Sequence, residues 1–321
     1  MDRKYISWNI GRNLGGRDGD KLKSIFGLVT WATVADRDIV MLPTRHVSGR
    51  YVHGDLSHMG VVYEYPQDIQ SMEQIHIKGD TRPHPWGGVS YESFIRYQEE
   101  FVSKKDVHIV TLRGLPRVMP HLVYEWALTH GQPGLMSLYD NTKNWFRDII
   151  SSSFATNQVE NTIQDKDTYT IAIHIRTGDI ARRMIQNGFD GNYYEMLITA
   201  IRRACFNSNL TPDIQIHSIG NHPMVKWFCN KYQLKNMSSK HVSSTAAFKT
   251  FLDCDLFIPA SSSLSTVACT IKEHGHIMLP HSGLGLKHYF TSESKYIPQG
   301  HIPVNSLTDM VNSLERIFDK R

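Results

Sequence analysis

Two short segments of the chain carry side chains that suit an anionic ligand. The first, His174-Ile-Arg-Thr-Gly-Asp179, directly follows an apolar run that predicts a strand. Alternation along a strand places His174 and Arg176 on one face. A guanidinium holds a diphosphate through paired hydrogen bonds and keeps its charge, so Arg176 is a candidate diphosphate ligand. A structural ion pair between Arg176 and Asp179 at the strand end is the alternative interpretation.

The second segment is a run of hydroxyl residues between an expected strand, Leu256 to Pro259, and an expected helix, Ser265 to Glu273. Backbone N–H groups at a helix N-terminus form an anion site, and neighbouring hydroxyls add donors. Ordinary N-capping by Ser263 or Ser265 explains the same pattern without a ligand. The candidate donor-binding residues of this segment are Ser261, Ser262, Ser263, Ser265 and Thr266.

The glycine-rich stretch Gly11 to Gly19 also lies between an expected strand and an expected helix. It has neither the spacing of a dinucleotide-binding fingerprint nor the Gly-Lys-Ser/Thr ending of a P-loop, so the stretch alone is weak evidence for a nucleotide site. Charges of both signs nevertheless stand where a ligand could bind. The candidates in this stretch are Gly15, Gly16, Arg17 and Asp18.

Acidic triplets and a cluster of aromatic residues are the remaining chemical signals. Of the Asp-x-Asp triplets, Asp165-Lys-Asp167 and Asp253-Cys-Asp255 do not follow an expected strand, which disfavours a metal-dependent sugar-transfer site. His84 and Trp86 could contact a sugar face, and Trp86 could stack on it. The aromatic residues that follow them, from Tyr91 to Tyr97, are typical of a protein core.

A parallel sheet is needed to position these loops. Strand Tyr5 to Ile10, helix Asp20 to Ala35 and strand Ile39 to Leu42 form a β-loop-α-β unit in the first half. The second half alternates strands and helices and predicts a doubly wound sheet, in which ligands bind beyond the carboxyl ends of the strands. Its expected strands are Tyr169 to Ile175, Ile214 to Ser218, Leu256 to Pro259 and His276 to Leu279.

Length and composition are those of a globular protein with two domains. The chain has 321 residues, 40% hydrophobic and 21% charged. The polar stretch Asn157 to Thr168 is the candidate linker, and an amphipathic helix, Ser306 to Phe318, ends the chain. A net charge of +4 without basic runs disfavours a nucleic-acid binder. Four dispersed cysteines disfavour a disulfide framework. No apolar leader or membrane segment is visible, so we expect a soluble, cytoplasmic protein.

At this point the motifs resemble those of a known family. His174-Ile-Arg-Thr-Gly-Asp179 resembles the HxRxGD motif of the fucosyltransferase superfamily, which includes the α1,2-, α1,6- and protein O-fucosyltransferases. The segment Ala246 to Ile271 is similar to a second shared motif, in which a helix and a strand lead into a serine-rich loop and another helix. The stretch Gly11 to Pro43 resembles the opening loop, helix and strand of these enzymes.

The resemblance implies a GT-B fold, α/β in class, with two Rossmann-like domains facing each other across a cleft. Residues 1–160 would form the mainly acceptor-side domain, residues 161–300 the nucleotide-sugar-binding domain, and residues 301–321 a helix that packs back toward the first domain. The implied activity is an inverting, metal-independent transfer from a GDP-sugar, commonly GDP-fucose, to a hydroxyl of a glycan or glycoconjugate. No cofactor is implied, and the oligomeric state is open.

The resemblance also implies roles for single residues. Arg176 matches the arginine that binds the donor diphosphate, His174 the histidine near the nucleoside, and Ser262 with Ser263 the serines that contact phosphate. Ser218, at a strand end, is a further donor-binding candidate, and His84 with Trp86 are the acceptor-binding candidates. Asp18 and Asp179 are the candidates for the catalytic base.

Two departures from the family pattern leave the donor open. The acidic residue expected before the serine-rich loop is replaced by Ala247, and the acidic base of the opening loop would fall near Arg12. A different nucleotide sugar on the same fold, or a sugar-nucleotide-binding or glycan-binding protein without catalysis, are therefore the alternative functions.

Overall fold

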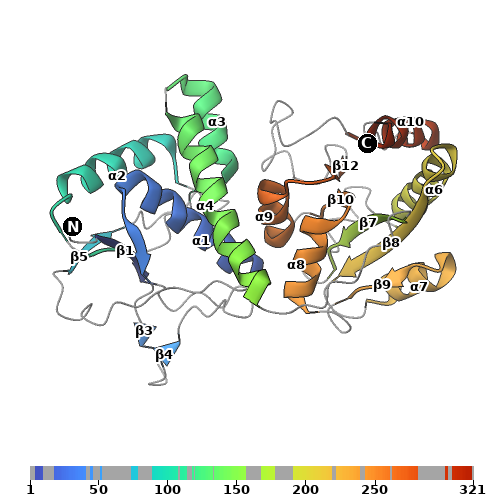
Figure 1. Cartoon of the computed structure of the whole chain (residues 1–321), viewed down its shortest axis with the longest axis horizontal. Helices are drawn as coiled ribbons and strands as arrows, with labels where there is room; N and C mark the ends of the chain where they lie inside the picture. Colours follow the sequence, from blue (N-terminus) through green and yellow to red (C-terminus); the bar gives the residue numbers. More distant parts are fainter. Residues whose placement is uncertain are drawn as a thin grey trace. The chain divides into compact units, whose positions relative to one another are not determined.

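The computed structural model describes the chain in two compact units, Met1–Gln158 and Val159–Arg321 (Figure 1). Residues outside the description are 1–3, 10–17, 41–43, 46–50, 53–73, 79–88, 108, 114–117, 119, 133, 157–167, 178–190, 219–221, 239–242, 261, 281–300, 303–305 and 320–321. Each unit holds a parallel sheet with helices packed on it, which confirms the predicted α/β class. Among the described helices, none is both long and apolar enough to cross a bilayer.

The first unit is built on a four-stranded parallel sheet in the order β2-β1-β6-β5. The strands are β1 (Tyr5–Asn9), β2 (Asp38–Val40), β5 (Gln74–Lys78) and β6 (Ile109–Arg113). The helices are α1 (Asp18–Ala35), α2 (Tyr91–Ser103), α3 (Pro120–His130) and α4 (Leu135–Thr156). A separate antiparallel pair joins β3 (Thr44–Arg45) and β4 (Tyr51–Val52).

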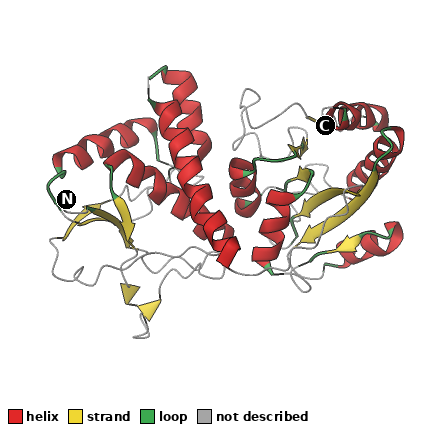
Figure 2. Cartoon of the chain, in the orientation of Figure 1, coloured by secondary structure: helices red, strands yellow, loops and turns green. Residues whose placement is uncertain are grey.

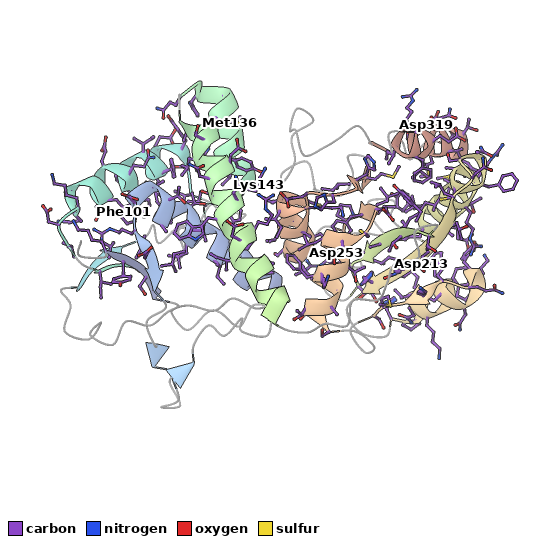
Figure 3. All side chains as sticks on the ribbon, viewed as in Figure 1. Phe101, Met136, Lys143, Asp213, Asp253 and Asp319 are labelled. Carbon is purple, nitrogen blue, oxygen red and sulfur yellow. The ribbon has the colours of Figure 1, made fainter. Side chains whose placement is uncertain are left out.

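An aromatic cluster centred on Trp31 of α1 holds the helices of this unit together. Trp31 is fully buried, and its ring lies 5.1 to 5.5 Å from the rings of Phe94, Tyr97 and Phe101 on α2 (Figure 3 labels Phe101). Aromatic pairs at such spacing stabilise a core beyond the area they bury. Phe94 and Tyr97 therefore belong to the core, as expected, whereas Tyr91 is half-buried.

The buried Arg37 fixes the amino-terminal edge of the same sheet. Its guanidinium donates to the carbonyl oxygens of Tyr5 at 3.2 Å, Val107 at 2.7 Å and Lys104 at 2.8 Å. One side chain thus donates to three backbone carbonyls of different segments. Arg37 therefore links the start of β1, the approach to β6 and the end of α2.

The second unit has a five-stranded parallel sheet, β11-β10-β7-β8-β9 (Figure 2). If the five strands are numbered 1 to 5 along the chain and read from β9 to β11, their order is 3-2-1-4-5, the order of a Rossmann sheet. The strands are β7 (Thr168–Ile175), β8 (Thr211–Ser218), β9 (Lys235–Asn236), β10 (Leu256–Ile258) and β11 (His276–Ile277), and a short parallel pair is β12 (Leu279–Pro280) with β13 (His301–Ile302). The helices are α6 (Gly191–Asn207), α7 (Pro223–Tyr232), α8 (Ser244–Asp253), α9 (Ser263–Ile271) and α10 (Leu307–Phe318).

Alternation along β7 separates the two faces of this sheet. Tyr169 contacts Phe318 of α10 with ring centroids 5.0 Å apart, whereas His174 contacts Phe251 of α8 and Ser265 of α9. Odd and even positions of a strand point to opposite faces. The helices α8 and α9 therefore cover one face of the sheet, and α10 with its partner α6 covers the other (Figure 1).

The helix α10 packs on α6 of its own unit. Its apolar stripe is buried there, against α6 and Tyr169. The residues of that stripe are Met310, Val311, Leu314, Ile317 and Phe318. Asn207 at the end of α6 also donates to Glu315 at 2.6 Å. An apolar stripe shows that a helix needs a partner without showing which one, so the expected packing toward the N-terminal domain stays a prediction.

Candidate functional site

The candidate site lies at the carboxyl end of β7. The chain leaves β7 toward β8 and β9 and later returns to β10 on the other side, so β7 and β10 flank the point where the strand order reverses. Ligands of open α/β sheets bind beyond the strand ends at such a point. His174 is the penultimate residue of β7, and Ser262 follows β10.

A hydrogen bond joins these two loops. The Nδ1 of His174 lies 2.6 Å from Oγ of Ser265, which also accepts from the backbone N–H of Ala260 at 3.3 Å. Ser262 Oγ lies 3.5 Å from the same Nδ1, at the limit of a hydrogen bond. His174 is thus held by the start of α9, and the end of β7 is fixed to the loop after β10.

Burial keeps His174 neutral. The residue is 4% exposed, and desolvation lowers its pKa to about 3, with smaller contributions from His217 and Arg176. A neutral imidazole offers one N–H donor and one lone pair. His174 can therefore orient a ligand by hydrogen bonding at neutral pH without adding charge.

The hydroxyls at the start of α9 make structural hydrogen bonds. Ser262, rather than Ser263 or Ser265 as expected, is the N-cap, and its Oγ accepts from the N–H of Ser265 at 3.0 Å. The hydroxyl of Thr266 donates to the carbonyl of Ser262 at 2.9 Å. Since Ser265 and Thr266 are buried and engaged, the first N–H groups of α9 are the groups best placed to bind an anion.

Arg176 directly follows β7 and is partly exposed. It is two residues beyond His174, so strand alternation directs it to the same side of the sheet. The position places a permanent positive charge at the carboxyl edge of the sheet, two residues beyond His174, which contacts the start of α9. Asp179 lies outside the described residues, so the alternative of an ion pair between the two stays open.

Ser218 lies on the other face. It is the last residue of β8 and pairs in register with Ile175 of β7, one residue beyond His174. The structure therefore does not bring its side chain together with His174, although the sequence grouped them as donor-binding residues. Corresponding residues on neighbouring strands share a face, and one position along the strand reverses it.

Several predicted site residues lie outside the described part of the chain. They are the donor-binding candidates Gly15, Gly16, Arg17 and Ser261, the base candidate Asp179, and the acceptor-binding candidates His84 and Trp86. Asp18 is the first residue of α1, and its side chain is also outside the description. Ser263, the first residue of α9, is half-buried.

The sequence analysis did not select His217, which the structure places beside His174. The two histidines are paired in register on β7 and β8. His217 is 1% exposed, and burial lowers its pKa to about 4. One signal in the sequence could have indicated His217. Like His174 in its own strand, it is the penultimate residue of an expected strand, Ile214 to Ser218, so both histidines lie near the carboxyl ends of their strands.

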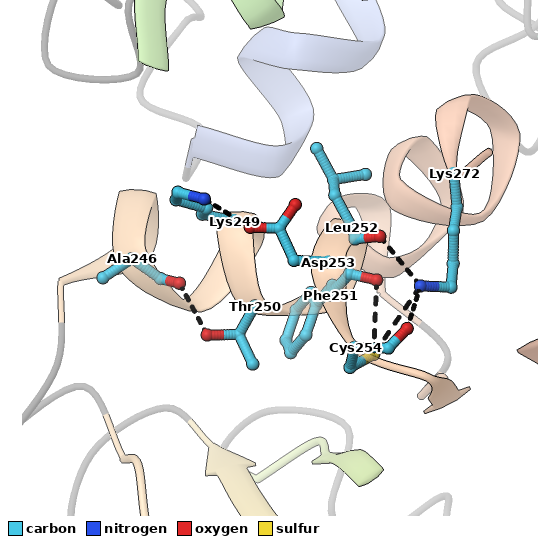
Figure 4. A network of polar contacts seen from close by, with 8 residues as sticks. All are labelled: Ala246, Lys249, Thr250, Phe251, Leu252, Asp253, Cys254 and Lys272. Atoms are coloured by element: carbon cyan, nitrogen blue, oxygen red, sulfur yellow. Dashed lines mark hydrogen bonds and ion pairs between the residues drawn. The ribbon is translucent and has the colours of Figure 1, made fainter. Parts of the chain in front are cut away.

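The acidic triplet Asp253-Cys-Asp255 serves the fold at the opposite edge of the sheet. Asp255 accepts from the N–H of Thr170 at 2.7 Å, and Asp253 pairs with Lys249 on α8. Lys272 donates to the carbonyls of Leu252 at 2.8 Å and Cys254 at 2.5 Å, which closes the end of α8 (Figure 4). These contacts explain the two aspartates without a metal ion.

Comparisons with known proteins give low similarity throughout. No family model and no curated protein matches the chain. Among solved structures, POFUT1 in complex with GDP-fucose has 10% identity and a TM-score of 0.44, over 87% of this chain and 98% of that chain. The fucosyltransferase NodZ from Bradyrhizobium has 11% identity and a TM-score of 0.35, over 84% and 92%. OtsA in its apo form has 9% identity and a TM-score of 0.31, over 79% and 71%.

Proposed function

We propose that this protein is a fucosyltransferase-like glycosyltransferase that moves a sugar from a GDP-sugar to a hydroxyl of a glycan or glycoconjugate. One observation carries the proposal: the contact between His174 and Ser265, at 2.6 Å, joins the strand that precedes Arg176 to the start of α9. A cation and a helix N-terminus thereby share the edge of a Rossmann-ordered sheet. This is a setting for a diphosphate.

The chemistry of transfer requires charge to be stabilised on the departing nucleoside diphosphate. Negative charge develops on it as the bond to the sugar breaks. Arg176 and the first N–H groups of α9 would stabilise that charge, because preorganised donors act where charge appears in the transition state. A permanent arginine charge takes the part that a metal ion has in metal-dependent transferases, so we propose transfer without a divalent cation.

The acceptor hydroxyl would attack the anomeric carbon from the side opposite the diphosphate, which inverts the configuration at that carbon. A carboxylate would accept the hydroxyl proton as general base. Asp18 and Asp179 are the candidates, and neither is distinguished by the contacts described here. GDP-fucose is the donor implied by the sequence motifs.

The test is to incubate the purified protein with GDP-fucose and other nucleotide sugars and to measure free sugar and nucleoside diphosphate. Slow hydrolysis of one donor, undiminished in EDTA, supports metal-independent catalysis. Activity that EDTA removes and Mn²⁺ restores would contradict it.

A second candidate is a binding protein on the same fold that lacks catalysis. It is favoured by Arg12, which stands where related enzymes carry an acidic base. Thermal melting with GDP, UDP, ADP and dTDP reports binding in either case, since a ligand of the folded state raises the melting temperature. A nucleotide that stabilises the protein while no sugar donor is turned over would favour this second function.

A further inference from the structure

The imidazole of His217 is held at the edge of the candidate site. Phe251 of α8 contacts both histidine rings, stacked on His174 at 5.4 Å and edge-on to His217 at 4.9 Å. Because His217 and His174 pair in register, the two side chains share the face covered by α8 and α9. His217 therefore lies one strand away from the contact between His174 and Ser265.

Among the described residues, no group satisfies the nitrogens of this ring. His217 is 1% exposed, and neither Nδ1 nor Nε2 has a hydrogen-bond partner. A buried polar group without a partner is unfavourable, and native structures contain few of them. A phenylalanine would fill the same space without this cost. The unpaired ring is thus left for a partner outside the described residues, such as a bound ligand.

The charge state of the ring indicates what kind of partner it suits. Burial lowers the pKa of His217 to about 4, so the ring is neutral at pH 7 and has one donor and one acceptor. A phosphate is matched better by Arg176 and the start of α9, which carry positive charge or partial charge. A neutral ring suits a group with its own donor and acceptor, such as a ribose hydroxyl or the edge of a nucleotide base.

We propose that His217 binds the nucleoside part of the donor, through a ribose hydroxyl or the edge of the base. This inference rests on the proposed function, and it assigns the two parts of the donor to different residues of the site. Arg176 and α9 hold the diphosphate, and His217 determines which nucleoside is accepted. His217 is a specificity residue and takes no part in the transfer itself.

The test separates the nucleoside from the phosphates by comparing two variants with two kinds of ligand. His217→Phe removes both nitrogens and keeps the contact with Phe251, whereas His217→Gln keeps a donor and an acceptor. Binding of GDP, UDP, ADP, dTDP and inorganic pyrophosphate is measured by calorimetry. Thr142→Val on α4 is the matched control, because Thr142 Oγ1 is also a buried polar atom without a partner, in the other unit.

We expect His217→Phe to weaken the tightest-binding nucleoside diphosphate about tenfold, as the loss of one or two hydrogen bonds implies. Pyrophosphate binding should stay unchanged, and His217→Gln should recover part of the lost affinity. Without ligand, His217→Phe should melt at the same temperature as the wild type or higher. Thr142→Val should bind every ligand as the wild type does.

Two further measurements identify the group that His217 contacts. If it is the ribose hydroxyl, the wild type discriminates against the 2′-deoxy analogue of its tightest ligand, and His217→Phe does not. If it is the base, His217→Phe binds the four nucleoside diphosphates with similar affinity. Unaltered discrimination in both comparisons would overturn the inference.

The outcomes distinguish this inference from the proposed function. If the wild type binds a nucleoside diphosphate and His217→Phe binds it equally well, the inference is overturned and the proposed function stands. Equal losses for pyrophosphate and for the nucleoside diphosphate would also overturn it, since His217 would then act on the phosphates or on the fold. If the wild type binds none of the four nucleotides, the proposed function fails and the inference fails with it. If the phenylalanine variant does not fold, His217→Leu serves the same comparison, because it also removes both nitrogens.

Discussion

Ser265 Oγ lies 2.6 Å from Nδ1 of His174, although the two residues are 91 positions apart in the sequence. The contact joins the end of β7 to α9, the helix that follows the neighbouring strand β10. Both residues are buried, so the hydrogen bond is shielded from water and fixes the ring. The geometry of the candidate site depends on this pair.

Replacing Arg176 tests the diphosphate site. Arg176→Lys keeps the charge and loses the planar fork, so turnover should fall markedly, and Arg176→Ala should lose about 10² to 10³ in kcat. Both variants should keep the wild-type melting temperature. Turnover and thermal melting are measured together, with Arg203→Lys on the exposed side of α6 as the control.

The alternative structural role of Arg176 predicts the opposite pattern. If Arg176 and Asp179 form a structural ion pair, Arg176→Ala lowers the melting temperature and Asp179→Ala lowers it by a similar amount. Near-normal turnover in both Arg176 variants would refute the role in catalysis.

Removing the Ser265 hydroxyl should destabilise the second unit. Ser265→Ala leaves Nδ1 of His174 and the N–H of Ala260 without their partner, which should lower the free energy of unfolding by about 1–3 kcal/mol. Urea unfolding measures the change. Thr199→Ala removes an exposed hydroxyl bonded within α6 and should change stability much less. Equal effects of the two variants would show that the contact with His174 contributes little.

The two buried histidines should make stability depend on pH. Burial lowers the pKa of His174 to about 3 and of His217 to about 4, whereas each titrates near its ordinary value of 6.5 in the unfolded chain. Between pH 6.5 and 4 the unfolded state therefore binds more protons, and the free energy of unfolding falls as pH falls. At pH 5 each histidine should contribute a loss of about 2 kcal/mol.

The measurement is urea unfolding at pH 7, 6 and 5 for the wild type and for His217→Phe. The variant should lose less stability on acidification than the wild type, because one of the two titrating rings is absent. Parallel pH profiles for the two proteins would contradict this expectation.

Lys272 should contribute more to the stability of the protein than Lys249, although both contact α8. Lys272 donates to two carbonyls at the end of the helix and is half-buried, so Lys272→Ala should cost about 1–2 kcal/mol. Lys249 pairs with the exposed Asp253 within the helix, and Lys249→Ala should cost only about 0.3–0.5 kcal/mol. Thermal melting of the two variants is the measurement. A larger loss for Lys249→Ala would reverse the ranking of the two contacts.

The sequence predicted the second unit better than the first. Strand and helix patterns there alternate regularly, and the expected strands Tyr169 to Ile175 and Ile214 to Ser218 lie within β7 and β8. In the first unit, β5 and α2 were missed. The strand has only five residues in a stretch rich in glycine, histidine and proline, and the helix is marked by aromatic residues that also suit a sugar site. The sequence also favours a strand at Val61 to Tyr65, and these residues lie outside the described part of the chain.

The candidate site could likewise be predicted only in part from the sequence. His174, Arg176 and the serine-rich segment could be predicted because each follows a strand. That Ser262 caps α9, that Ser218 faces away and that His217 has no partner depend on register and packing between strands far apart in the sequence. Local patterns do not contain that information.

The pairing of α10 with α6 has a consequence for how the chain folds during synthesis. The ribosome makes α6, residues Gly191–Asn207, long before α10, residues Leu307–Phe318. Until α10 emerges, the apolar surface of α6 that it covers remains open to solvent on the nascent chain. Domains generally fold as units, and exposed apolar surface favours aggregation. The Rossmann unit would therefore reach its native state late in translation, and chaperones that bind apolar segments would find α6 available until then.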